Sequence, residues 1–278
     1  MMQSDARELL NIEHLRVQNV EGLQDKKLKG VSTDSRRVKP GEVFFAIRGE
    51  KFDGHDFVSD AAQRGCLAAV VEDRLLPSAV RVENLPLLIL NDSTKALGDF
   101  ARFYKRKFDI PVIAVTGSNG KTTTKEMIAE VLGEKFTVLK TEGNLNNHIG
   151  VPQTLFRLEK KHDVAVIELG TNHFGEIDYL CTVAEPTYGL ITNVGRAHLE
   201  FFGSLEGVAQ AKGELFERLQ PRGFGFVNAD DRRVVDKARK LRRKLTYGFE
   251  EKRANIKGRF LGLNDRVQPS FSFGGLSL

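Results

Sequence analysis

The sequence predicts an α/β protein with two parts, a small N-terminal α/β domain and a larger domain built on a mainly parallel sheet. From residue 112 onward, short apolar runs alternate with helix-like stretches, which is the pattern of a sheet whose strands are joined by helices. Up to about residue 90 the strands and helices are shorter and glycines separate them. The length of 278 residues matches about two domains of ordinary size.

The N-terminal part contains four elements that the apolar periodicity predicts. Two are strands and two are helices: 42–47 and 68–71, then 57–64 and 94–108. Asp92 and Ser93 are typical N-terminal caps for the last helix, and Pro111 follows its basic end. We therefore predict a domain boundary after Asp109, giving domains 1–109 and 110–278.

The second part alternates between strand and helix patterns. The predicted strands are 112–115, 137–139, 164–169, 190–193, 224–228 and 245–247, and the predicted helices are 122–132, 151–158, 205–219 and 231–242. After Gly248 the chain becomes polar and glycine-rich, with strand-like pieces at 256–261 and 270–273. This second domain is expected to be incomplete at its C-terminal end.

The composition excludes several classes of protein. Hydrophobic residues make up 41% of the chain, which excludes a disordered protein, and the net charge of +5 is weak evidence for nucleic-acid binding. The two cysteines cannot form a disulfide framework. The start of the chain lacks the pattern of a signal peptide, and no apolar run approaches the roughly 18 residues of a membrane span. We expect a cytoplasmic protein without a membrane span, and the basic run 239–244 is expected to be a solvated helix face.

The strongest chemical signal is GSNGKTT, residues 117–123, which directly follows a predicted strand and opens a predicted helix. Glycines at both ends of the turn let the backbone amides face a phosphate group, and the helix N-terminus adds its positive end. Lys121 is placed to reach the β- and γ-phosphates, and the Thr122 hydroxyl to bind Mg²⁺. Val115 stands where the longer form of this motif has a glycine. The motif predicts nucleotide binding.

Polar residues also follow two later strands, at the sheet edge where parallel α/β proteins bind ligands. Glu168 ends the strand 164–169, where a carboxylate either holds Mg²⁺ or is solvated. His198 lies in the segment after the next strand and could be a metal ligand, a proton carrier or a buried hydrogen-bonded histidine. Lys212, inside a predicted helix, is by itself typical of a solvated lysine.

Five segments in one order resemble the Mur ligase family of ATP-dependent amide-forming enzymes of peptidoglycan synthesis. They are GSNGKTT, GNLNNHIGVPQTL, ELGTNHFGEI, NVGRAHLEFFGS and AKGELF. Upstream, STDSR at 32–36 and DGHDF at 53–57 are similar to the N-terminal domain of the family, which holds the uridine end of the substrate. The second and third segments resemble the branch that adds D-alanyl-D-alanine to UDP-N-acetylmuramoyl-tripeptide through an acyl phosphate.

The resemblance implies a role for each matching residue. ATP would be bound by Gly117, Ser118, Asn119, Gly120, Lys121, Thr122 and Thr123, with Asn228 and Asp231 near the adenosine. Mg²⁺ ions would be held by Thr122, Glu168, His198 and, if it is carbamylated, Lys212. The catalytic residues would be Lys121, His198 and Lys212, and the substrate would be bound by Ser35, Arg36, Thr141, Asn144 and Asn172.

The resemblance also leaves alternatives open. Family members carry a third, C-terminal domain that nothing here matches, so we expect substrate binding with little or no turnover by this chain alone. The chain could instead belong to another ligase of the family, one that adds the third peptide residue or resembles folylpolyglutamate synthases, or be a non-catalytic nucleotide-binding protein. A nucleic-acid-dependent ATPase is the weakest reading. The expected oligomeric state is a monomer.

Overall fold

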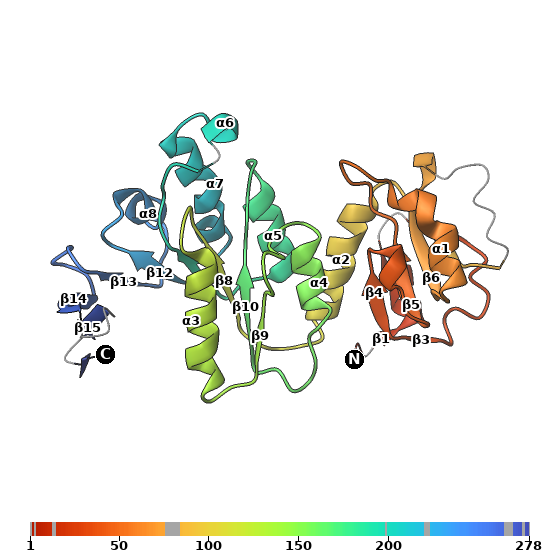
Figure 1. Ribbon diagram of the computed structural model, residues 1–278, viewed down its shortest axis with the longest axis horizontal. Coiled ribbons are helices and arrows are strands. Elements are labelled where there is room, and N and C mark those ends of the chain that lie inside the picture. The colour runs from red at the N-terminus through yellow and green to blue at the C-terminus, as the bar shows by residue number, and fades with distance from the viewer. Residues whose placement is uncertain are drawn as a thin grey trace. The chain divides into compact units, whose positions relative to one another are not determined.

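A computed structural model describes residues 2, 4–12, 15–75, 84–197, 199–219, 223–263, 269–273 and 276–277 (Figure 1). The chain forms two compact units, residues 1–109 with 148–161, and residues 110–147 with 162–278. The break after Asp109 lies where the sequence analysis places its boundary. Residues 148–161, which that analysis places in the second domain, belong to the first unit.

The first unit is built on a five-stranded sheet in the order β2-β7-β6-β5-β4, in which only β2 is antiparallel to its neighbour. The strands are β2 Arg16–Gln18, β4 Gly30–Ser32, β5 Glu42–Phe45, β6 Ala68–Glu72 and β7 Leu87–Leu90. A two-stranded sheet pairs β1 Ser4–Asp5 with β3 Lys27–Leu28. The α-helices are α1 Val58–Gln63, α2 Ser93–Lys105 and α4 Gly150–Leu155, and the 3₁₀ helices are Ala6–Asn11, Ser35–Arg37, Gly54–Phe57 and Asp73–Leu75.

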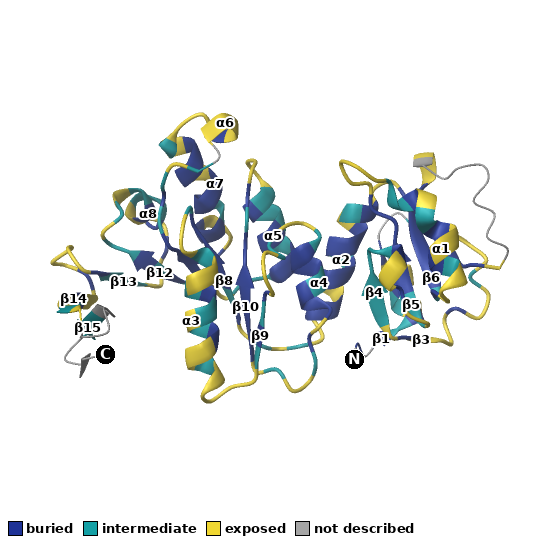
Figure 2. Cartoon of the chain, viewed as in Figure 1, coloured by how far each residue is buried: buried dark blue, intermediate teal, exposed yellow. Residues whose placement is uncertain are grey.

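Neighbouring phenylalanines of β5 show how this sheet is covered on both faces. Phe44 packs in one cluster with Val58 and Ala61 of α1, and the ring of Phe45 stacks on Phe100 of α2 with centroids 6.4 Å apart. Successive side chains of a strand point to opposite faces, so α1 and α2 cover opposite faces of the sheet. The buried strands of this unit lie between the partly exposed helices in Figure 2.

The segment 148–161 joins the first unit through aromatic contacts with α2. The rings of Phe156 and Phe100 lie with centroids 5.6 Å apart, and the hydroxyl of buried Tyr104 donates to the carbonyl oxygen of Leu158 at 2.9 Å. These contacts link positions more than 50 residues apart in the sequence, so neither periodicity nor motif spacing could predict them.

The second unit holds a nine-stranded sheet in the order β16-β15-β14-β13-β12-β11-β8-β10-β9. Its strands are β8 Val112–Thr116, β9 Val138–Lys140, β10 Val164–Glu168, β11 Tyr188–Ile191, β12 Phe224–Asn228, β13 Lys244–Gly248, β14 Ile256–Leu263, β15 Pro269–Phe273 and β16 Leu276–Ser277. All pairs from β9 to β14 are parallel, and the last two are antiparallel. The predicted α/β class with a mainly parallel sheet is confirmed.

Helices cover both faces of this sheet. They are α3 Lys121–Gly133, α5 Glu176–Ala184, α6 Leu199–Phe202, α7 Leu205–Arg218 and α8 Arg232–Lys237. Leu190 of β11 packs in one cluster with Ala129 of α3, whereas a Cβ on the preceding Gly189 would lie 2.6 Å from Leu219 at the end of α7. Since neighbouring strand residues face opposite ways, α3 and α7 lie on opposite faces. Glycine at 189 allows α7 to approach the sheet closely.

The structure corrects the prediction of a basic helix face at 239–244. Helix α8 ends at Lys237, and Lys244 begins β13 instead of continuing a helix. The Lys244 ammonium donates to the carbonyl oxygen of Ala238 at 2.8 Å, which satisfies one carbonyl left open at the helix end. Lys244 therefore contributes to ending α8 and begins the next strand.

No helix in the described ranges combines the length and the apolar character that a membrane crossing requires.

Candidate functional site

The carboxyl end of β8 carries a phosphate-binding loop. Residues 117–120 turn the chain from β8 into the 13-residue helix α3, and Gly120 caps that helix in the left-handed conformation with φ of +78°. Gly117 has φ of +148°, which side-chain-bearing residues rarely adopt. The first backbone N–H groups of α3 have no acceptor within the helix, an arrangement that binds an anion.

Lys121 lies at the first position of α3, and its ammonium donates to the carbonyl oxygen of Gly117 at 2.9 Å. This contact holds the cation over the loop. A phosphate placed in the loop would compete for the same ammonium, as expected for a lysine that binds phosphate as a point charge. Thr123 follows with an exposed side chain.

Glu168 at the end of β10 is 1% exposed, and both of its carboxylate oxygens have donors. The hydroxyl of Thr122 donates to Oε2 at 2.9 Å, and the side-chain amide of Asn146 donates to Oε1 at 2.8 Å. The ammonium of fully buried Lys125 lies 4.0 Å from Oε2. A buried carboxylate is stable when it is hydrogen-bonded and close to a cation, so this cluster holds Glu168 in one position.

Thr141, expected to bind substrate, is fully buried behind Glu168. Its hydroxyl accepts from the backbone N–H of Glu168 at 3.0 Å, and its carbonyl oxygen accepts from Lys125 at 2.7 Å. This geometry favours a role in holding the carboxylate cluster over direct contact with a substrate.

The pair Thr122 and Glu168 fits a magnesium ion. Magnesium prefers oxygen ligands and takes one or two from the protein, while phosphate oxygens and waters complete its shell. Outside the masked positions, no group of three His, Cys, Asp or Glu side chains could hold a metal by itself. His198, the expected second ligand site, lies outside the described residues.

The segment after β11 lies against the phosphate loop. Asn193 exchanges two hydrogen bonds with the backbone of Asn119, one from the Asn119 N–H at 3.1 Å and one to its carbonyl oxygen at 3.0 Å. The hydroxyl of Thr192 donates to the same carbonyl at 2.7 Å, and Ser118 bonds the backbone of Gly195 in both directions. The segment NVGRAHLEFFGS was expected at this sheet edge from its position after a strand, but its contacts with the phosphate loop were not predicted.

Asn228 and Asp231, expected near an adenosine, lie at the end of β12 and the start of α8. The Asn228 side-chain amide donates to the carbonyl oxygen of Thr192 at 2.9 Å. One Asp231 oxygen accepts from the N–H of Val194 at 2.7 Å, and the other caps α8. Both side chains therefore support the segment beside the phosphate loop.

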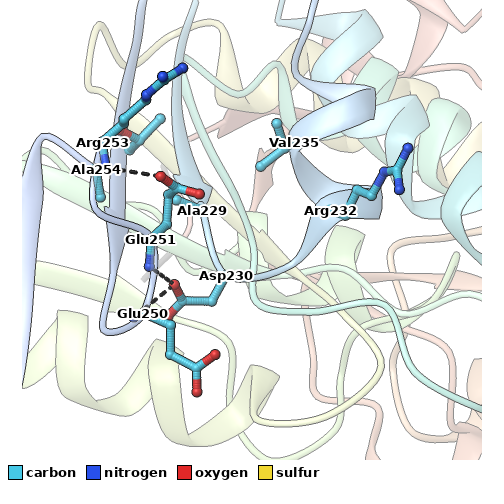
Figure 3. A pocket seen from close by; sticks show the side chains of 9 residues that line it. Ala229, Asp230, Arg232, Val235, Glu250, Glu251, Arg253 and Ala254 are labelled. Atoms are coloured by element: carbon cyan, nitrogen blue, oxygen red, sulfur yellow. Dashed lines mark hydrogen bonds between the residues drawn. The ribbon is translucent and has the colours of Figure 1, made fainter.

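A cavity of about 680 Å³ opens beyond the ends of β12 and β13. Its lining carries both signs of charge and comes from Ala229, Asp230, Arg232, Val235, Thr246, Glu250, Glu251, Arg253 and Ala254 (Figure 3). Asp230 lies beside the turn 249–251 and accepts three of its backbone N–H groups at 2.6–3.1 Å. Burial alone would raise the pKa of Asp230, but these donors outweigh it and hold the pKa below its ordinary value.

We expect Asp230→Ala to loosen this turn without unfolding the unit. Losing the bonds to a charged acceptor should cost on the order of 1–2 kcal/mol of local stability. Amide hydrogen exchange would show faster exchange at Phe249, Glu250 and Glu251, with Asp236→Ala, which removes an exposed ion pair to Arg239, as the control. Unchanged exchange at the three amides would contradict this account.

Lys212 of α7 is 2% exposed, so it is not the solvated lysine that its sequence context suggests. Burial, with a smaller contribution from the positive charge of Lys121, lowers its pKa to about 8. Among the described residues Lys212 has no hydrogen-bond or ion-pair partner. The structure thus brings together Lys121, Thr122, Glu168 and a buried lysine that loses its proton easily.

Two glutamates organise the loop before α5. Glu176 accepts from the backbone N–H groups of Asn172 and His173 at 2.6 and 3.0 Å. Burial opposes these bonds, but the donors prevail and lower the pKa of Glu176. Glu214 of α7 accepts from the N–H groups of Gly175 and Asp178, and burial raises its pKa. The Asn172 side chain stays exposed, as does that of Asn144 in the loop after β9.

The first unit holds the remaining expected substrate residues. Arg36 is exposed and forms a two-pronged pair with Asp34, with both N–O distances 2.9 Å, while Ser35 is buried. The Gln153 side chain donates to the Thr33 hydroxyl at 2.7 Å, which ties α4 to this segment. The STDSR segment and α4 therefore form one surface of this unit.

Comparison with known families identifies both units. Residues 115–274 match the model described as Mur ligase middle domain, and residues 27–105 match that described as Mur ligase family, catalytic domain.

Relatives and solved structures agree with these matches. The chain is 46% identical over 207 residues to the UDP-N-acetylmuramoyl-tripeptide--D-alanyl-D-alanine ligase of Escherichia coli, covering 74% of this chain and 44% of that protein. A crystal structure of MurF from Acinetobacter baumannii superposes with a TM-score of 0.85 at 32% identity, over 98% of this chain and 59% of that one. MurF ligase from Thermotoga maritima in complex with ADP superposes with a TM-score of 0.80 at 30% identity, over 88% of this chain and 56% of that one. The chain spans about half the length of the curated relatives it matches.

Proposed function

The chain belongs to the Mur ligase family, and we propose that it serves in the ATP-dependent addition of D-alanyl-D-alanine to UDP-N-acetylmuramoyl-tripeptide. The observation that carries this proposal is the phosphate loop with Thr122 hydrogen-bonded to buried Glu168, in a chain 46% identical to a relative named for that reaction. Since the chain covers 44% of that relative, the activity of the whole protein is inferred from the name of the relative.

The proposed reaction has two steps. The terminal carboxylate of the muramoyl peptide attacks the γ-phosphorus of ATP, which forms an acyl phosphate and releases ADP. The amine of D-alanyl-D-alanine then attacks the acyl carbon, and phosphate leaves after a proton is lost from nitrogen. The first step brings two anions together, so fixed positive charge and N–H donors at the phosphates are the main requirement. Lys121 and the first backbone N–H groups of α3 supply them. The N–H groups of Ser118 and Asn119 already donate to Asn193.

The adenosine of ATP is proposed to lie at the carboxyl end of β12, next to Asn228 and Asp231. This position continues from the phosphate loop along the same sheet edge, where parallel α/β sheets bind their ligands. The cavity lined by Asp230 and Arg232 opens beside it.

Thr122 and Glu168 are proposed to hold one Mg²⁺ and His198 a second. When bound, Mg²⁺ neutralises charge on the transferring phosphate and so supplies electrostatic stabilisation. Lys212 is proposed to carry a carbamate, formed when its neutral amine adds CO₂ and loses a proton. The pKa of about 8 favours this step, because a much larger fraction of the amine is neutral at physiological pH than in an ordinary lysine.

Substrate contacts are proposed in both units. Ser35 and Arg36 would bind the uridine end, and the exposed side chains of Asn144 and Asn172 would face the peptide. Thr141 would act indirectly, through the backbone of Glu168. We further propose a cytoplasmic monomer without nucleic-acid partners.

We expect Thr122→Val to remove most of the effect of magnesium on nucleotide binding. The substitution keeps the shape of the side chain but deletes the hydroxyl that bonds Glu168. Isothermal titration with a non-hydrolysable ATP analogue measures how much Mg²⁺ increases the affinity for the nucleotide. This increase should be about tenfold smaller in the variant, the effect expected when a metal ligand or a residue that orients one is lost. Thr123→Val is the matched control, and equal magnesium effects in both variants would contradict the assignment.

Titration with muramoyl nucleotides tests the proposed function itself. We expect UDP-N-acetylmuramoyl-tripeptide to bind more tightly than the dipeptide form, in the presence of Mg²⁺ and the ATP analogue. Preference for the dipeptide would favour the ligase that adds the third residue, and binding of a folate would favour a folylpolyglutamate synthase. Binding of the ATP analogue alone would leave a nucleotide-binding protein with another partner.

A further inference from the structure

The phosphate loop receives much of its support from a segment far away in the sequence. Residues 192–195 follow β11, more than 70 positions after the loop, and contact Ser118 and Asn119 through both side-chain and backbone atoms. We infer that Asn193 is a positioning residue of the nucleotide site, which sets the orientation of the loop without touching the ligand. This inference rests on the proposed nucleotide binding and extends it.

The carboxamide of Asn193 holds one residue of the loop from two sides. Its oxygen accepts from the N–H of Asn119 at 3.1 Å, and its nitrogen donates to the carbonyl oxygen of Asn119 at 3.0 Å. The Thr192 hydroxyl adds a second donor to that carbonyl at 2.7 Å. Only an amide side chain offers both a donor and an acceptor in this fork, so aspartate or leucine could not replace it.

The direction of the Asn119 carbonyl decides which groups face the phosphate. A carbonyl oxygen that turned toward the anion would repel it. In a trans peptide the C=O and the following N–H point in opposite directions. Two donors on the β11 side therefore hold the Asn119 oxygen on that side, and the N–H of Gly120 is directed away from it. The first amides of α3 are then free to bind phosphate.

Asn228 and Asp231 support this arrangement from the other side. Asn228 donates to the carbonyl oxygen of Thr192 at 2.9 Å, and Asp231 accepts from the N–H of Val194 at 2.7 Å. The segment 192–195 is thus held between the end of β12 and the phosphate loop. A change in Asn193 should reach the phosphates through the loop and leave the adenosine end in place.

The experiment compares Asn193→Ala with the wild-type chain and with Asn255→Ala. Asn255 is a matched control because its side-chain oxygen also accepts a backbone N–H, that of Thr246 at 2.9 Å, at the β13–β14 connection. Affinities for ADP, inorganic pyrophosphate and adenosine are measured by titration. Comparing them separates effects on the binding of the phosphates from effects on the binding of the adenosine. We expect Asn193→Ala to weaken ADP and pyrophosphate about tenfold, the effect of two lost hydrogen bonds, with adenosine unchanged.

Thr192 provides a second pair of variants that remains informative if Asn193→Ala folds poorly. Thr192→Val should weaken ADP and pyrophosphate, and Thr192→Ser, which keeps the hydroxyl, should restore them. Amide hydrogen exchange without ligand should be faster at Gly120 and Lys121 in Thr192→Val than in Thr192→Ser.

The outcomes separate this inference from the function it rests on. Equal weakening of all three ligands in Asn193→Ala, or no weakening of any, would overturn the positioning role while nucleotide binding stands. A wild-type chain that binds none of the three would overturn the proposed nucleotide site and the positioning role with it.

Discussion

Replacing Gly117 with alanine is expected to destabilise the second unit by about 3 kcal/mol and to abolish nucleotide binding. An added Cβ would lie 1.8 Å from the Thr192 hydroxyl and 3.1 Å from the Thr192 backbone nitrogen. The residue also has φ of +148°, a conformation that alanine avoids. Relief of the clash would move the loop away from β11 and break the bonds that orient Asn119.

Two further variants test this explanation. Gly133→Ala at the end of α3 is the control, because a Cβ there meets no atom within 4 Å and alanine favours a helix. The double variant Gly117→Ala with Thr192→Ala removes the hydroxyl that causes the closest contact and should recover part of the stability. Urea unfolding measures both effects. If Gly117→Ala alone were as stable as the wild type and bound ADP with the same affinity, the loop would accommodate the added Cβ and this explanation would be wrong.

The parts of the fold predicted well from sequence are those whose pattern is local. β8 and β10 are short apolar runs buried in the middle of a sheet, and α7 is long enough for a helical period to show. The phosphate loop GSNGKTT could also be predicted, because the loop and the strand and helix that flank it are contiguous in the sequence. Family matches at 115–274 and 27–105 confirm the resemblance that these local motifs support.

The parts that could not be predicted depend on contacts between distant positions. Asn193 looks like an ordinary turn residue after a strand, and nothing in its spacing connects it to Asn119. Thr141 looks like a surface threonine until Glu168 is placed beside it. The position of 148–161 follows from the packing of Phe156 on Phe100, which no local period encodes. The roles of the expected site residues stay predictions, and His198 lies outside the described residues.

Replacing Lys212 with methionine is expected to stabilise the second unit by up to about 3 kcal/mol at pH 7. The pKa of Lys212 falls from 10.5 to about 8 because burial disfavours the charged form. Below pH 8 both folded and unfolded chains carry the proton, so the cost of burying the charge is fully present. Between about pH 8 and 10.5 only the unfolded chain keeps it, so stability rises with pH. Methionine fills the same space without charge and should remove this rise.

Unfolding experiments from pH 6 to 10 in CO₂-free buffer measure two effects of Lys212→Met. One is the gain in the free energy of unfolding at pH 7, and the other is the loss of its rise with pH. Lys240→Met, at an exposed lysine, serves as the control and should leave stability and slope unchanged. If Lys212→Met were as pH-dependent as the wild type, the amine would not be the group that titrates. Added bicarbonate should stabilise the wild-type chain and leave Lys212→Met unaffected, because only the lysine can form a carbamate. A variant that gains stability but loses this response would show that the buried amine is kept for chemistry and not for folding.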